Sequence, residues 1–470
     1  MRILLINICI RYDTPVKYIP VGLSCIATAL DREGFRPDIL DIDLYEYREE
    51  EILKFLSENN DYDIVGMGNI VSGYKFTKNI AVMVKNVIPK ALLVVGNTVA
   101  TSIPEILLTR VPQIDIAVIG EGDRTIVDIV NAFALKKDWR GVNGIAYRNG
   151  NDVVLTKKRD AINEIKNIPF PDYSLFEIDK YISLSNKTIS EPLPPISFEK
   201  LKALPINTAR GCLFNCTFCG HAFKGYKYRY YPFDMVVDHI KGLQKIYGIN
   251  YVHFWDELTF FSRKRLEELC NVIEKTGTNF YWIINTRPNT FTMKDLDLLK
   301  RAKDLGALVM GGAFESADGE ILKAMNKKMV IDQYIEQVRV AKKAGLEVST
   351  SLVFGYPQET KITIKKTIDL CRQLEIYPSA GFLLPLPKTP IYEYAIKTGL
   401  IKNEEEYLLR IGDRQDLHIN LTAMSDEEFF ETLREELIRL KDDLRIPISD
   451  DNVIKTTIYK VAPRKGQRKQ

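Results

Sequence analysis

The chain lacks a long apolar run, and it carries little net charge for its length. Arg2 is followed by only a strand's length of apolar residues, at 3–6, which is too short for the core of a signal peptide. No later stretch approaches the length of a membrane span. A formal net charge of +3 over 470 residues predicts no strong field for nucleic acid or for a membrane surface. We therefore expect a cytoplasmic protein that binds neither.

Paired cysteines are also missing. Four of the seven cysteines stand singly in apolar stretches, where they are typical of small core residues: Cys9, Cys25, Cys270 and Cys371. The other three lie together, in Arg210-Gly-Cys-Leu-Phe-Asn-Cys-Thr-Phe-Cys-Gly220. Few cysteines in a long chain without a secretory signal indicate a reducing compartment. Structural zinc usually takes its ligands as two separated pairs, and the chain has no second pair.

The three clustered cysteines are Cys212, Cys216 and Cys219, and they place three thiolates on one loop. Three thiolates can hold a [4Fe–4S] cluster by three of its irons and leave the fourth iron without a protein ligand. An open iron can bind a substrate or a cofactor. With His221 close behind, the same run can also be interpreted as a Cys3His zinc site in a binding or scaffold protein without catalysis. Metal analysis separates these two interpretations.

The cysteine spacing, with the aromatic Phe218 just before the last cysteine, resembles the signature of the radical S-adenosylmethionine (SAM) enzymes. The resemblance implies that the open iron chelates the amino and carboxylate groups of SAM. It also implies that an electron from the cluster cleaves SAM to a 5′-deoxyadenosyl radical. The partners that it implies are a small-molecule substrate and an electron donor such as flavodoxin or ferredoxin.

Residues 1–155 alternate short apolar runs with amphipathic stretches, which predicts an α/β domain with a doubly wound parallel sheet. The predicted helices lie at 21–33, 75–87 and 125–135. Asn149-Gly150 between two short runs predicts a closing hairpin. The predicted strands lie at 3–6, 39–42, 64–67, 92–95 and 116–119.

Residues 156–204 show no sustained period and contain several prolines, so we interpret them as a connector without chemistry. A second alternation over 205–394 fits six βα repeats of a partial TIM-like barrel, in which the cysteine loop follows the first strand. Residues 395–470 predict a helical C-terminal region with helices at 404–411 and 427–444 and a basic, frayed end. The predicted barrel strands lie at 206–209, 251–255, 281–284, 307–310, 348–354 and 380–384.

Further positions in the barrel resemble the radical SAM family. Arg287, at the end of the third strand, lies where relatives place an arginine near the SAM carboxylate, and Glu315 in Gly311-Gly-Ala-Phe-Glu-Ser316 matches a glutamate directed at the SAM amino group. An unpaired buried carboxylate would be costly, which favours a ligand partner for Glu315 over a bare core glutamate. Asp256 and Glu257 either assist SAM or substrate binding or cap the next helix.

Two later turns match the family with departures. Gly355-Tyr-Pro-Gln-Glu-Thr360 resembles the Gly-x-Pro-Gly-Glu-Thr turn after strand five and departs at Gln358. Leu384-Pro-Leu-Pro-Lys-Thr-Pro390 resembles a Pro-x-Pro-Gly-Thr-Pro segment and departs at Lys388. Both departures replace a loop glycine, so they affect local conformation and leave the assignment in place.

A doubly wound domain, the connector segment Ile168-Pro-Phe-Pro-Asp-Tyr173 and a radical SAM barrel together resemble the cobalamin-dependent radical SAM enzymes. The resemblance implies cobalamin bound beyond the carboxyl ends of the first domain's strands. All four histidines lie outside that domain, so it offers cobalt no imidazole; the alternative is a domain that kept its fold and lost the cofactor. The candidate cobalamin contacts are Asn69, Gly96, Asn97, Gly120, Glu121 and Gly122.

The reaction that these resemblances favour is methylation of an unactivated carbon by a cobalamin-dependent radical SAM methyltransferase. A non-methylating radical reaction, such as a cyclisation or rearrangement on the same scaffold, is the alternative. No motif in the sequence identifies the substrate.

Overall fold

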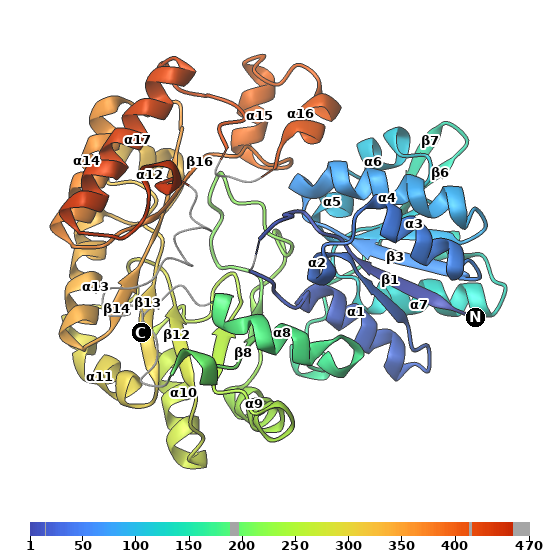
Figure 1. Ribbon diagram of the computed structural model, residues 1–470, viewed down its shortest axis with the longest axis horizontal. Coiled ribbons are helices and arrows are strands. Elements are labelled where there is room, and N and C mark those ends of the chain that lie inside the picture. The colour runs from blue at the N-terminus through green and yellow to red at the C-terminus, as the bar shows by residue number, and fades with distance from the viewer. Residues whose placement is uncertain (15, 189–196, 413–415, 455–470) are drawn as a thin grey trace. The chain divides into compact units, whose positions relative to one another are not determined.

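The computed structural model describes residues 1–14, 16–188, 197–412 and 416–454 (Figure 1). They divide into two compact units. Unit 1 consists of Met1–Tyr181, Gly220–Arg229 and Leu386–Gly412. Unit 2 consists of the described residues of Ile182–Cys219, Tyr230–Pro385 and Asp413–Gln470. The proline run 192–195 and the basic end 463–470 lie outside the described residues.

Unit 1 is built on a seven-stranded sheet in the order β2-β1-β3-β4-β5-β6-β7. The first five strands in the chain run parallel, and β6 and β7 add the predicted antiparallel hairpin, with Asn149 opposite Asp152. The doubly wound α/β fold predicted for this region is confirmed. The strands are β1 (Ile3–Asn7), β2 (Asp38–Asp41), β3 (Ile64–Gly68), β4 (Leu92–Gly96), β5 (Ile116–Val118), β6 (Ile145–Asn149) and β7 (Asp152–Leu155).

Helices cover both faces of this sheet, which explains why its central strands are almost wholly apolar. In Figure 1, α1 (Val21–Arg32) and α7 (Asp123–Ala134) lie on one side of it, and α3 (Glu49–Glu58), α4 (Tyr74–Val87) and α6 (Pro104–Arg110) lie on the other. The short helices α2 (Ile42–Tyr45) and α5 (Asn97–Ser102) follow directly from β2 and β4.

The region predicted as a connector has more structure than its lack of period indicated. Up to Tyr181 it counts with unit 1. The Tyr181 hydroxyl donates to Asp41 at 2.6 Å, and the backbone N–H of Asp172 donates to the Thr28 hydroxyl at 2.7 Å. It also contains helix α8 (Ile178–Leu184).

The described residues of unit 2 form seven parallel strands in two ladders at the six predicted positions, and the predicted partial barrel is confirmed. Five strands pair in the order β14-β13-β12-β11-β8, and β15 pairs with β16. The single strand predicted over 348–354 is split at Thr350, because the chain changes its pairing partner there. The strands are β8 (Ala203–Ile206), β11 (Tyr251–Phe254), β12 (Tyr281–Asn285), β13 (Ala307–Gly311), β14 (Glu347–Ser349), β15 (Ser351–Phe354) and β16 (Ser379–Phe382). Two-residue strands, β9 (Ala209–Arg210) and β10 (Arg229–Tyr230), come before and after the cysteine loop in the sequence.

The helices of unit 2 alternate with its strands as the periodicity predicts. The two helices predicted to end at glycine do so, with Gly306 at φ +98° and Gly345 at φ +80°. A further short helix, α12, was not predicted. The helices are α9 (Phe233–Tyr247), α10 (Arg263–Thr276), α11 (Leu296–Asp304), α12 (Gly319–Ala324), α13 (Ile331–Lys343) and α14 (Lys361–Gln373).

The predicted C-terminal helices form, and they divide between the two units. Helices α15 (Pro390–Lys397) and α16 (Glu404–Arg410) count with unit 1, whereas α17 (Asp426–Asp443) counts with unit 2. Helix α17 lies beside α14 (Figure 1) and buries Phe429, Leu433, Leu437 and Leu440. None of the helices in the described part of the chain is apolar over a length that would span a bilayer.

Candidate functional site

The cysteine loop is anchored where it leaves the first barrel strand. Asp256, just beyond β11, accepts hydrogen bonds from the backbone N–H of Thr208 (2.7 Å) and of Ala209 (3.0 Å), and from the hydroxyls of Thr208 (2.6 Å) and Thr259 (3.0 Å). Burial raises the pKa of Asp256, and these donors act in the opposite direction. Asp256 therefore fixes the entry to the loop. The alternative that it caps the next helix is wrong, because Ser262 caps α10.

The other side of the loop is held by the end of α12. The backbone N–H of Thr217 donates to the Met325 carbonyl at 3.0 Å, and its hydroxyl donates to the Ala324 carbonyl at 2.8 Å. The Asn326 side chain donates to the Asn215 carbonyl at 2.8 Å. The entry to the loop at Thr208 and Ala209 and its middle at Asn215 and Thr217 are therefore both tied to barrel elements.

The three cysteines differ in exposure. Cys216 is buried, and Cys212 and Cys219 are half-buried. Within the described part of the chain, no three His, Cys, Asp or Glu side chains converge as they would around one metal ion. The thiolates of a cubane bind three different irons and need not converge on one point. Three thiolates on one loop are the donors that a [4Fe–4S] cluster takes from a protein.

Arg287, at the end of β12, lies against this loop. Its guanidinium carbon is 3.7 Å from the centroid of the Phe214 ring, and its Nη1 is 3.8 Å from the Cys216 Sγ. Its Nη2 donates to the Lys327 carbonyl, while its Nε–H is buried without a hydrogen-bond partner among the described residues. A buried donor without a partner is uncommon, and a bound ligand or ion that accepts from it is one explanation.

Glu315 follows β13 and is buried, with its backbone in the left-handed region at φ +67°. Its carboxylate is paired with the Lys327 ammonium at 2.9 Å. The premise that this carboxylate would be buried unpaired without a ligand is therefore wrong, because a lysine of the same unit pairs with it. Lys327 was missed from the sequence because it lies after a short helix, where a lysine ordinarily indicates only a solvated surface.

Phe218 joins the same group of side chains. Its ring meets the Tyr356 ring edge to face, with centroids 6.4 Å apart, and the Lys327 Nζ lies 5.8 Å from its centroid. The Tyr356 hydroxyl is hydrogen-bonded to the Thr217 hydroxyl at 2.8 Å. The structure thus brings Cys216, Phe218, Arg287 and Glu315 together around Lys327, although they come from separate parts of the barrel sequence.

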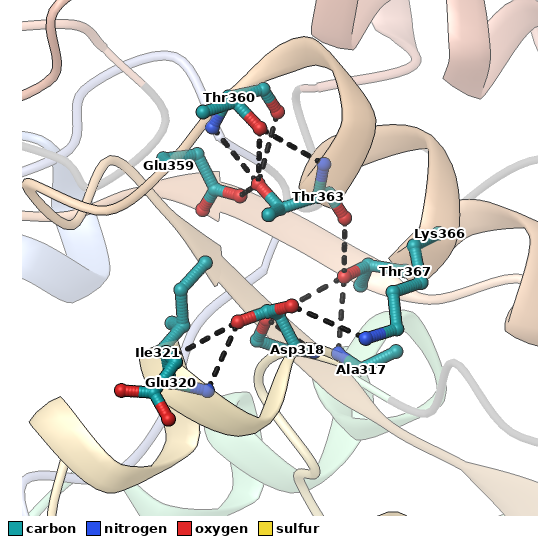
Figure 2. Close-up of polar contacts among 10 residues, drawn as sticks. Ala317, Asp318, Glu320, Ile321, Glu359, Thr360, Thr363, Lys366 and Thr367 are labelled. Carbon is teal, nitrogen blue, oxygen red and sulfur yellow. Dashed lines mark hydrogen bonds and ion pairs between the residues drawn. The ribbon is translucent and has the colours of Figure 1, made fainter.

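Hydrogen bonds join the turn after β15 and the start of α14 to the segment that follows Glu315 (Figure 2). Glu359 is buried and accepts from the Thr363 hydroxyl, and burial raises its pKa to about 7. The Thr367 hydroxyl donates to the Thr363 carbonyl at 2.9 Å and accepts from the backbone N–H of Ala317 at 3.0 Å. Because Ala317 lies two residues after Glu315, these bonds tie helix α14 to the turn that carries the carboxylate.

In unit 1, the predicted cobalamin contacts fall into two groups. Asn69 and Asn97 lie at the carboxyl ends of β3 and β4, where each side-chain oxygen accepts from the next backbone N–H, at 2.9 Å and 2.6 Å. The Asn69 carbonyl also accepts from the N–H of Val99 at 3.1 Å. A Cβ added at Gly96 would meet no described atom within 4 Å, so there is open space beside the end of β4.

The Gly120-Glu121-Gly122 turn after β5 is instead engaged by protein atoms. Glu121 pairs with Arg229 and accepts from the backbone N–H of Ile162 at 3.0 Å. A Cβ at Gly120, which has φ +80°, would lie 2.1 Å from the Tyr226 hydroxyl, and one at Gly122 would lie 2.9 Å from Ile26. The expected cobalamin contact from the Glu121 carboxylate thus competes with two protein partners.

Comparison with known families finds two matches, one in each part of the chain. Residues 7–130 match the model of the B12 binding domain, and residues 206–371 match the model of the radical SAM superfamily. The first match covers the strand ends that carry Asn69, Gly96 and Asn97. The second covers the cysteine loop together with Arg287, Glu315 and Lys327.

Individual relatives carry different names. A protein of Pyrococcus horikoshii named an uncharacterized methyltransferase is 29% identical over 387 residues, which is 81% of this chain and 79% of that protein. The anaerobic magnesium-protoporphyrin IX monomethyl ester cyclase of Cereibacter sphaeroides is 27% identical, over 80% of this chain and 60% of its own length. In fold, the chain is similar to the radical SAM methyltransferase TsrM of Kitasatospora setae, solved with cobalamin and a [4Fe–4S] cluster (TM-score 0.66, 18% identity, 85% of this chain and 76% of that one).

Proposed function

Because the chain belongs to the radical SAM enzymes that carry a B12-binding domain, we propose that it is a methyltransferase that adds a methyl group to an unactivated carbon of a small molecule. Its cofactors are a [4Fe–4S] cluster, SAM and cobalamin. When bound, the cluster and SAM supply a carbon-centred radical, and cobalamin supplies a carrier for the methyl group.

The residues of unit 2 hold and orient these groups in the proposed site. Cys212, Cys216 and Cys219 bind three irons of the cluster. Arg287 lies beside Cys216 and offers its Nε–H to an acceptor on SAM, where the carboxylate is the strongest one. Glu315 accepts from the SAM ammonium, and Phe218 shields the group from water.

Unit 1 has the proposed task of holding cobalamin at the carboxyl ends of β3 and β4. The open space at Gly96 is the feature that favours this position, since ligands of such sheets bind beyond these strand ends. Glu121 and Gly122 contribute indirectly, because their contacts with Arg229 and Ile26 shape the neighbouring turn. Residues 7–130 contain no histidine, so this segment offers cobalt no imidazole ligand.

The observation that carries the methyltransferase proposal is the B12-binding domain at 7–130 joined to a barrel whose relatives include proteins named methyltransferases. A methyltransferase can use cobalamin directly, as the carrier of the methyl group. The ester cyclase among the relatives favours a second candidate, a non-methylating radical reaction on the same scaffold.

Product analysis separates the two candidates. The protein is reconstituted without oxygen with iron, sulfide and hydroxocobalamin. It is then given reduced flavodoxin, methyl-labelled SAM and a deproteinised small-molecule extract of its native host. A methyltransferase forms S-adenosylhomocysteine and 5′-deoxyadenosine together, and the label enters a small molecule. The Cys216→Ala variant is the matched control and should form no 5′-deoxyadenosine.

Formation of 5′-deoxyadenosine without S-adenosylhomocysteine and without label transfer would contradict the methyltransferase proposal and favour the cyclisation or rearrangement. Formation of neither product by protein with a full complement of iron and cobalt would contradict both.

A further inference from the structure

A turn that follows the last barrel strand carries a lysine in a backbone conformation that ordinarily belongs to glycine. Lys388 has φ +63°, and the backbone N–H of Thr389 donates to the Leu386 carbonyl at 3.1 Å, which closes a four-residue turn. Pro387 stands at its second position and Lys388 at its third, as in a type II turn, where the third residue is usually glycine or asparagine. A lysine there is strained, so we looked for a use of its side chain that offsets the strain.

The Lys388 side chain ties this turn to the helix that follows β4. Its Nζ donates to the Thr101 carbonyl at 2.6 Å. Thr101 lies near the end of α5, a helix that begins directly after Gly96 and the open space beside it. The Thr101 hydroxyl also accepts from the backbone N–H of Gly120 at 3.0 Å. Thr101 therefore joins α5 both to the turn of Lys388 and to the turn after β5.

The same turn packs on the residue that follows the third clustered cysteine. A Cβ added at Gly220 would lie 3.2 Å from the Leu386 Cδ1 and 3.7 Å from the Thr389 Cγ2, so these two side chains lie directly against the Gly220 backbone. Both Gly220–Arg229 and Leu386–Gly412 count with unit 1, whereas the cysteine loop up to Cys219 counts with unit 2. Contacts within unit 1 therefore hold a residue that is one peptide bond away from a proposed cluster ligand.

We propose that Lys388 is a positioning residue that couples the cobalamin site to the cluster, because its bond to Thr101 holds Leu386 against Gly220 and thereby positions Cys219. Restraint of α5 by cobalamin beside Gly96 reaches Cys219 through this bond. Coupling between two binding sites is reciprocal, so the cluster in turn strengthens the binding of cobalamin. The inference rests on the two cofactors of the proposed function and not on methyl transfer.

The segment that begins at Gly220 has a second anchor that does not use Lys388. The Arg229 Nη1 donates to the Ile162 carbonyl at 2.8 Å, and its Nη2 pairs with Glu121. A substitution at Lys388 leaves this anchor intact. Such a variant therefore tests the coupling without releasing the whole segment.

The test is the Kd for hydroxocobalamin, measured without oxygen on the full chain with and without its reconstituted cluster. The ratio of the two Kd values reports the coupling, whereas a purely structural role would change both values alike. Lys388→Gly removes the ammonium and suits the turn, and Lys388→Arg keeps a cationic donor for the Thr101 carbonyl. Lys136→Gly is the matched control, because Lys136 also has a left-handed backbone, at φ +54°, and its side chain has no hydrogen bond or ion pair among the described residues.

We expect the cluster to lower the Kd about fivefold or more in the natural chain, in Lys388→Arg and in Lys136→Gly, which is near the lower end of couplings between ligand sites. In Lys388→Gly the ratio should fall to about twofold or less. If that variant does not fold, Lys388→Asn gives the same comparison, since asparagine also tolerates the left-handed region.

A Lys388→Gly protein with the ratio of the natural chain would overturn the proposal, even if both of its Kd values were raised. A natural chain whose Kd is the same with and without the cluster would overturn it as well. A failed product assay with the expected ratios would leave Lys388 assigned. A chain that reconstitutes its cluster and binds no hydroxocobalamin would count against the proposed function and this inference together.

Discussion

At the scale of single residues, the three buried carboxylates discussed near the candidate sites pair with other residues of the chain. Glu315 has Lys327, and Asp256 has four N–H and O–H donors. Glu121 has Arg229, with side chains only 4% and 7% exposed. Glu315 and Glu121 were predicted from the sequence to bind ligands. A motif shows an acidic residue but not its partner, which can lie a hundred residues away.

The Glu121–Arg229 pair leads to a stability prediction. Arg229→Met leaves the Glu121 carboxylate buried without its cation, and breaking a buried pair costs about 3–5 kcal/mol. The loss should appear in the urea unfolding transition of unit 1, together with weaker retention of cobalamin. Arg140→Met is the control, because Arg140 and Asp138 form an exposed pair worth about 0–1 kcal/mol. Equal stability of the two variants would contradict the role given to Glu121.

At the scale of elements, periodicity predicted most helices and strands, because each buries one face or both. It did not predict the break at Thr350 within 347–354, since a continuous apolar run carries no mark of the residue at which its pairing partner changes. The short helix α12 was also missed, although its last residues hold the cysteine loop. A helix of that length has too few turns for a readable period.

The turn that joins β15 to α14 leads to a prediction about pH. Burial raises the pKa of Glu359 to about 7, above the 4.5 of an ordinary glutamate. The folded chain then holds a proton that the unfolded chain has lost, so stability falls as pH rises from about 5 to about 7, by up to about 1.4 kcal/mol per pH unit. Glu359→Gln should reduce this slope in urea unfolding at several pH values.

Part of the slope should remain in Glu359→Gln, because the pKa of Glu257 is also raised to about 7 by burial. The control is Glu428→Gln at an exposed position, where the Lys361 ammonium lowers the pKa of the carboxyl. That variant should keep the natural slope above pH 5. A Glu359→Gln protein with the same slope as the natural chain would show that Glu359 is ionised throughout.

At the scale of the whole molecule, the order of elements predicted both α/β units but not how the chain is shared between them. The stretch Leu386–Gly412 counts with unit 1. Glu405 in α16 accepts from Lys78 at 2.8 Å and from Tyr74 at 3.2 Å, both in α4. The apolar face of an amphipathic helix predicts that the helix packs against another element. It does not predict which element that is. The cysteine spacing, in contrast, is read directly because all three proposed cluster ligands lie on one loop.

The proposed function depends on a [4Fe–4S] cluster held by Cys212, Cys216 and Cys219 with one iron open to SAM. The most direct measurement is electron–nuclear double resonance on the reduced, reconstituted protein with SAM labelled with ¹⁵N at its amino group. We predict a ¹⁵N coupling strong enough to require a direct bond between the nitrogen and iron, which is lost with unlabelled SAM. A reduced cluster that shows no such coupling in the presence of saturating SAM would contradict the account.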